Sequence, residues 1–228
     1  MKGDIDMEKI ITQEDILHLL DKLYEQSLNG IENVGPPINV LADDYLSKSN
    51  STEEAAKKFT AYQIAKCTTS GFITGLGGLI TLPVAIPANI SSVLYVQMRM
   101  IACLAYMGGY ETSSDQVKTL VYACLAGISV DQIIKQAGIK IGSKLTTAMI
   151  KKIPGTVITK INQKVGFRLL TKFGSKGVIN IAKAVPVVGG VISGGFYFAE
   201  TKVIANRAYK LFIEQDSSIL SEEYANLD

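Results

Sequence analysis

The stretch CTTSGFITGLGGLITLPVAIPANISSVLYVQM, residues 67–98, decides the fold. It runs for 32 residues without a charged side chain, although about 20 apolar residues are enough to cross a bilayer. Pro83 and Pro87 lie four residues apart, and a proline inside a helix removes a backbone hydrogen bond and clashes with the preceding turn. The stretch therefore predicts two apolar helices that meet at a bend near residues 82–86.

The second of these helices is expected to begin at Pro87, because proline is favoured in the first turn of a helix. It should end near Met107, before Gly108 and Gly109. Arg99 lies inside it among apolar neighbours, and an arginine in the middle of a membrane costs at least ~2.5 kcal/mol. This helix is therefore not interpreted as a simple membrane span.

Capping signals and helical periodicity continue on both sides of this stretch. Thr12 with Asp15 predicts the cap of the first helix, and Ser51 with Glu54 predicts a reciprocal cap for a later one. Residues 113–115, Ser-Ser-Asp, begin a further helix. No segment shows the convincing alternation of a strand. The fold class is therefore all-α, with apolar helices punctuated by glycine and proline.

Length and composition favour one multi-helix domain. The chain has 228 residues, of which 47% are hydrophobic, so it can bury a substantial core, and no stretch reads as a linker. The expected parts are an N-terminal amphipathic helix over residues 1–30, a helical domain over 31–214 and a polar tail over 215–228.

The cysteines and the N-terminus indicate a reducing compartment. Cys67, Cys103 and Cys124 are odd in number, widely spaced and set in apolar sequence, so we interpret them as small buried side chains. The first ten residues lack the apolar core of a secretory signal. The protein is therefore expected to start in the cytoplasm.

The residue types offer little for catalysis. His18 is the only histidine, so neither a zinc site nor a Ser/His or Cys/His pair can be assembled from the usual residues. The glycine-rich segments 75–78 and 138–144 lack the spacing of a nucleotide-binding loop. We therefore expect no catalytic residue, no metal and no cofactor.

The charge distribution is the strongest functional signal. Eleven basic residues and no Asp or Glu lie between Gln132 and Ala199, although the formal net charge is only +2. Ile161, Val165 and Leu169 form a stripe beside part of this block. Such a surface suits an anionic membrane, with long basic side chains reaching from an apolar contact to lipid phosphates. The residues at strict four-residue steps are the candidate membrane-binding or anion-binding set: Lys160, Lys164, Arg168, Lys172 and Lys176.

Two other interpretations of the basic block stay open. The first is a solvated face, or one that the acidic N-terminal helices of the same molecule neutralise. The second is nucleic-acid binding, which is disfavoured because the chain has no Trp and the basic helix has only Phe167 for base stacking.

Two further sets of residues are expected to shape the core. Arg99 and Glu200 are charges embedded in the most apolar helices, and a buried unpaired charge is costly. We therefore predict that they form an ion pair, the alternative being that each reaches water at a helix edge. Bends or close helix contacts are predicted at Gly75, Gly77, Gly78, Pro83, Pro87, Pro186, Gly189 and Gly190.

Four segments together resemble a known family. They are GLGGLITLPVAIP at 75–87, QMRMIACLAYMGGY at 97–110, KAVPVVGG at 183–190 and AYKLF at 208–212. In this order they resemble the EcsC family of bacterial proteins, over roughly residues 35–213. The resemblance implies an α-helical fold punctuated by glycine and proline and an association with membranes, and it implies no reaction.

The expected function is therefore non-catalytic. The protein would be peripheral to the inner membrane or partly inserted in it, on the cytoplasmic side. Its partners would be anionic lipids or a membrane protein, not nucleic acid, and oligomerisation is left open. One alternative is a membrane-inserting or pore-forming effector, and a second is a hydrolase that acts at the membrane surface.

Overall fold

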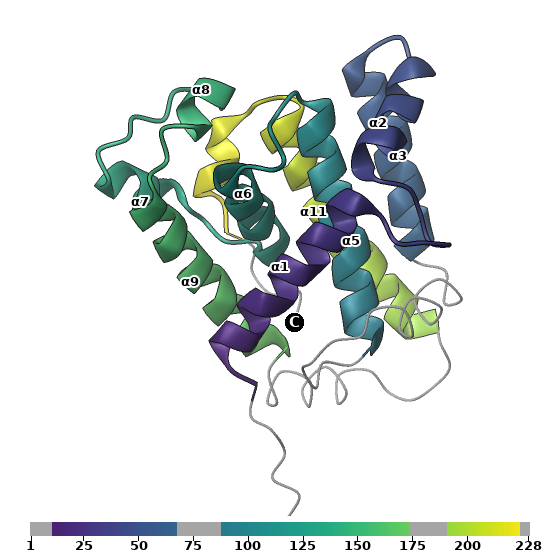
Figure 1. Cartoon of the computed structure of the whole chain (residues 1–228), viewed down its shortest axis with the longest axis horizontal. Coiled ribbons are helices and arrows are strands. Elements are labelled where there is room, and N and C mark those ends of the chain that lie inside the picture. The colour runs from purple at the N-terminus through teal and green to yellow at the C-terminus, as the bar shows by residue number, and fades with distance from the viewer. Residues whose placement is uncertain (1–10, 68–87, 174–190, 224–228) are drawn as a thin grey trace, which may run out of the picture.

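The computed structural model describes residues 11–67, 88–173 and 191–223 (Figure 1). The residues predicted to form bends or close contacts lie outside these ranges, and so does the last cation of the four-residue series. They are Gly75, Gly77, Gly78, Pro83, Pro87, Lys176, Pro186, Gly189 and Gly190.

The described residues confirm the all-α fold class. They contain no strand, and only isolated backbone bridges occur, at Ile31–Gly35 and Lys144–Asp216. None of the described helices is both long and apolar enough to cross a membrane. The elements are α1 (Gln13–Asn29), α2 (Ile38–Ser47), α3 (Thr52–Cys67), α5 (Ala88–Met107), α6 (Asp115–Ala126), α7 (Asp131–Gln136), α8 (Thr147–Ile150), α9 (Gly155–Phe173), α11 (Val191–Phe212) and the 3₁₀ helix η1 (Ser217–Ser221).

Helix α5 is the centre of the core. Every residue from Ser91 to Ala105 is buried, which is the behaviour expected of a helix that is apolar on all sides. Helices α1, α2, α3, α6 and α11 pack around it, while α9 packs against α1 and α6 (Figure 1). The N-terminal helix is thus part of the same core, with α2 and α3 on one side of α5 and α7, α8 and α9 on the other (Figure 1).

The predicted helix caps are present with one difference. Thr12 and Asp15 form a capping box at α1, and the Ser114 hydroxyl accepts a hydrogen bond from the Val117 amide at α6. At α3 the Glu54 amide donates to the Ser51 hydroxyl, as expected. The Glu54 carboxylate, however, accepts from Asn50 rather than closing the cap on Ser51.

Gly108, directly after α5, lies against Phe212 at the end of α11. A Cβ atom at this position would overlap the backbone carbonyl of Phe212. The next turn is fixed as well, because the Tyr110 hydroxyl donates to the Leu145 carbonyl at 2.6 Å and its ring packs edge-on against Phe212. Glycine is therefore required where these two helices meet.

The first residues of the predicted polar tail pack against the rest of the described domain. Ile219 and Leu220 of η1 are buried, although serine residues surround them in the sequence. The backbone also pairs with the segment between α6 and α8, since the Val130 amide donates to the Leu220 carbonyl at 2.8 Å and the Leu145 amide donates to the Gln215 carbonyl at 2.7 Å. The domain therefore continues through η1.

Candidate functional site

The predicted ion pair between Arg99 and Glu200 is absent, which corrects the sequence-based expectation. Arg99 is 6% exposed and donates hydrogen bonds to the backbone carbonyls of Ser27, at 3.0 Å, and of Pro36. Glu200 instead pairs with the ammonium group of Lys172. The last carbonyls of a helix have no partner within that helix, so the end of α1 presents acceptors to the Arg99 guanidinium.

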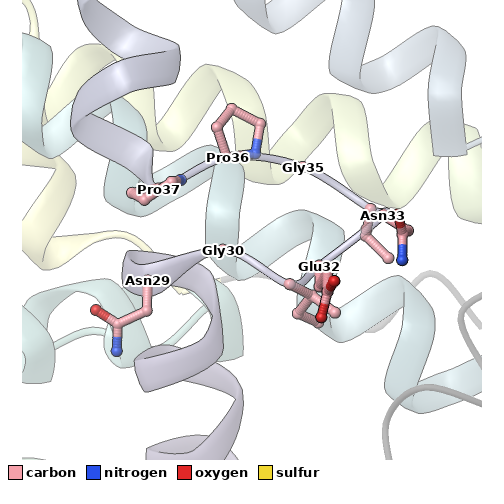
Figure 2. A pocket seen from close by; sticks show the side chains of 9 residues that line it. Asn29, Gly30, Glu32, Asn33, Gly35, Pro36 and Pro37 are labelled. Atoms are coloured by element: carbon pink, nitrogen blue, oxygen red, sulfur yellow. The ribbon is translucent and has the colours of Figure 1, made fainter.

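The loop that Arg99 holds encloses an open hollow of about 580 Å³, lined by residues 29–37 (Figure 2). Glu32 supplies the one carboxylate among these lining residues, and Asn29 and Asn33 supply amides. Gly30 has a φ of 78°, a backbone conformation that glycine favours. We interpret the hydrogen bonds of Arg99 as the contacts that hold this loop against α5.

Lys164 and Lys172 of helix α9 have partners within the domain. The Lys164 ammonium group donates to the Ser129 carbonyl at 3.0 Å and lies 3.5 Å from the Glu223 carboxylate. Lys172 pairs with Glu200 of α11. The intramolecular neutralisation that was left open thus occurs for these two cations, but the carboxylates come from the C-terminal part of the chain rather than from the N-terminal helices.

Lys172 is the more deeply buried of these two cations. Burial, followed by the neighbouring Arg168 guanidinium, lowers the pKa of Lys172 to about 8. The Glu200 carboxylate opposes this shift, because an adjacent opposite charge favours the ammonium form. Lys172 is therefore a structural cation, and a lipid phosphate would have to displace Glu200 to reach it.

The apolar stripe of α9 also faces inward, so the prediction that it lies against lipid is wrong. Ile161, Val165 and Leu169 are all buried within the core cluster. The packing against α1 is close at Gly166, where a Cβ atom would lie 2.7 Å from the Cγ atom of Gln13. The stripe stabilises the domain and is not available to a bilayer.

Within the basic block, the exposed cations of the described residues lie before α9 and in its first turns. We define the basic segment as residues 137–160, which contain no Asp or Glu and lie on the side of the molecule that carries α7, α8 and α9 (Figure 1). Glu111 reaches this surface, 3.9 Å from Lys151, and Asp216 lies beside it through a backbone bridge. The lysines of the segment are all exposed, and they are Lys140, Lys144, Lys151, Lys152 and Lys160.

The sequence-based prediction placed the site on the row of cations at four-residue steps. Of the five lysines in the basic segment, only Lys160 belongs to that row. The other four, Lys140, Lys144, Lys151 and Lys152, lie between the helices. Of the row itself, Lys160 is exposed and Arg168 is half-buried. The signal that could have found the others was the absence of acidic residues from 132–199, which covers the connecting segments as well as the helix.

The groups that could support other chemistry are dispersed. His18 is exposed, with its Nε2 atom 3.7 Å from a Glu14 oxygen. Burial raises the pKa of the Cys103 and Cys124 thiols to about 12, which makes them poor nucleophiles. Within residues 11–67, 88–173 and 191–223, no group of three or more His, Cys, Asp or Glu side chains could hold a metal ion.

Comparison of the chain with models of protein families, with curated proteins and with solved structures gives no match. The EcsC resemblance therefore rests on the four quoted segments alone, and membership of that family remains a proposal.

Proposed function

We propose that the protein is a non-catalytic, membrane-associated protein that binds an anionic lipid surface through its basic segment. The observation that carries the proposal is the exposure of all five lysines in a part of the chain that has no acidic residue of its own. The family resemblance, which implies membrane association, agrees with this proposal.

The charge of the segment suits reversible binding. Glu111 offsets one of the five lysines, Lys151, which leaves about four positive charges for an outside partner. Each lysine near an anionic membrane contributes about 1 kcal/mol, so the expected gain is about 4 kcal/mol. A tenfold change in affinity corresponds to about 1.4 kcal/mol, so anionic lipid should raise the affinity about 1000-fold.

The segment favours lipid over nucleic acid. It contains no Phe, Tyr or Trp, so it has no ring on which a base could stack. Half-buried apolar side chains, Ile139, Ile141 and Met149, accompany the lysines instead. That mixture of ammonium groups and aliphatic surface is typical of a protein that rests on lipid headgroups.

Flotation with vesicles tests the proposal. The full chain is mixed with neutral phosphatidylcholine vesicles or with vesicles that also contain phosphatidylglycerol. We expect it to float only with the anionic vesicles and to be released by high salt, because screening weakens exposed charges. Equal flotation with both lipids would contradict the proposal, and salt-resistant binding would favour the inserting alternative.

A pair of variants identifies the surface. Lys140, Lys144 and Lys152 are replaced by glutamine in one variant, and the control replaces Lys48, Lys57 and Lys58 of the α2–α3 side. The two variants lose the same charge from opposite sides of α5 (Figure 1). Only the first should lose flotation, and equal losses in both would assign binding to net charge instead of the basic segment.

A further inference from the structure

The outward face of α9 differs from its buried face and from the basic segment. It carries no acidic residue, because the helix as a whole has no Asp or Glu, and Lys160 is its one exposed lysine. Its remaining exposed positions are hydroxyl, amide and aromatic side chains. After Gly155, the exposed residues are Thr156, Thr159, Lys160, Gln163, Phe167 and Thr171.

Phe167 is the apolar residue on this face, and it is 63% exposed. A helix advances by about 100° per residue, so Phe167 lies seven residues and about 20° from Lys160 around the axis. Arg168 follows it directly and Lys164 lies one turn before it. The ring thus lies near the exposed Lys160, on the helix in which the basic segment ends.

A groove accompanies the ring. It has a volume of about 640 Å³ between α1 and α9, and Leu17 and Phe167 form its apolar walls. The polar lining comes from Gln13, Glu14, Gln163 and Lys164. The Gln13 amide donates to the Gln163 carbonyl at 2.7 Å, which holds the two helices together at this groove.

We infer that Phe167 is the apolar anchor of the membrane contact, inserting its ring into the interfacial layer of an anionic bilayer while α9 lies along the surface. This inference rests on the proposed function and adds an orientation to it. The partner is a lipid surface because Lys160 lies on the same face as the ring and no residue of α9 is acidic, which matches anionic headgroups; Glu14 of α1 is the one carboxylate among the residues that line the groove. Aromatic residues flanked by basic ones are typical of helices that lie in the interface.

The effect on affinity follows from the exposed ring. An aromatic side chain is a large apolar surface, and removing most of it from water is worth about a tenfold gain in affinity or more. The Phe167→Ala variant should therefore bind anionic vesicles about tenfold more weakly. Because the ring is mostly exposed in the free protein, its removal should leave the unfolding temperature nearly unchanged.

The absence of tryptophan from the chain allows a direct test of the depth of this residue. The Phe167→Trp variant has a single indole on the α9 face. Its matched control is Tyr62→Trp on α3, because Tyr62 is 56% exposed and α3 lies on the opposite side of α5 (Figure 1). Emission is recorded with vesicles of phosphatidylcholine and phosphatidylglycerol, with and without lipids brominated along the acyl chain.

The result expected is a blue shift and bromine quenching for Phe167→Trp, with no change for Tyr62→Trp. Flotation of both variants with an unshifted spectrum at position 167 would overturn the anchor and leave the proposed function standing. Equal shifts in both variants would also overturn the anchor, since the contact would then have no fixed orientation. Failure of both variants and of the unmodified chain to float would overturn the proposed function together with the anchor.

Discussion

Replacing Arg99 by methionine tests whether this buried guanidinium is held by backbone carbonyls instead of by Glu200. The guanidinium is almost fully buried and satisfies the carbonyls of Ser27 and Pro36. Methionine fills similar space without donors, so both acceptors lose a partner. A buried acceptor left without a partner costs about 1–3 kcal/mol, so the loss of two should be about 2–6 kcal/mol in the free energy of unfolding. For a chain of this size that corresponds to a fall of about 4–24 °C in the unfolding temperature.

A double-mutant cycle measured by urea unfolding separates this account from the pairing with Glu200 that the sequence suggested. The losses from Arg99→Met and Glu200→Gln should add within about 0.5 kcal/mol, because the two side chains have different partners. The losses from Lys172→Met and Glu200→Gln should not add, since each removes the same ion pair. Coupling above ~1 kcal/mol between Arg99 and Glu200 would refute the assignment.

Two further predictions concern the core. Gly108→Ala should lower the free energy of unfolding by more than ~2 kcal/mol in a urea titration, because its methyl group would overlap the Phe212 carbonyl. The control is Gly142→Ala, which should change the free energy of unfolding little because its methyl group would enter open space. Gly109 is not a suitable control, since its φ of 80° would strain an alanine. Stability should also fall as the pH rises above about 9, the ordinary pKa of the thiols, towards 12, because burial raises the pKa of Cys103 and Cys124 and the unfolded chain then loses protons that the folded chain retains. Urea unfolding at pH 8 and pH 10.5 should show this loss, and a Cys124→Ala slope equal to that of the unmodified chain would count against the thiol as a contributor.

Local features of the fold could be predicted from the sequence, because their partners are close along the chain. The caps at Thr12 and Ser114 depend on groups three residues away, so residue type and spacing suffice. The partners of Arg99 are backbone carbonyls 72 and 63 residues away, and a carbonyl leaves no mark in the sequence. η1 was missed for a related reason, since only Ile219 and Leu220 in a polar stretch indicate its burial.

The candidate site could be predicted only in outline. The absence of acidic residues from 132–199 is visible in the sequence, but whether each cation is paired or exposed depends on where distant carboxylates lie in the fold. Lys172 pairs with Glu200 and Lys164 pairs with Glu223, and no spacing rule predicts either ion pair. Periodicity also could not decide what the stripe of α9 contacts, because a protein core and a lipid chain both select apolar side chains.

The central claim is that the lysines of the basic segment, and not the net charge of the molecule, bind an anionic surface. The most direct measurement is the partition coefficient on phosphatidylglycerol-containing vesicles for the two triple glutamine variants at one fixed low salt concentration. Removing three lysines at about 1 kcal/mol each should lower the coefficient about 100-fold for Lys140, Lys144 and Lys152. The Lys48, Lys57 and Lys58 variant should stay close to the unmodified chain. An unchanged coefficient for the first variant, or the same fall in both, would contradict the account.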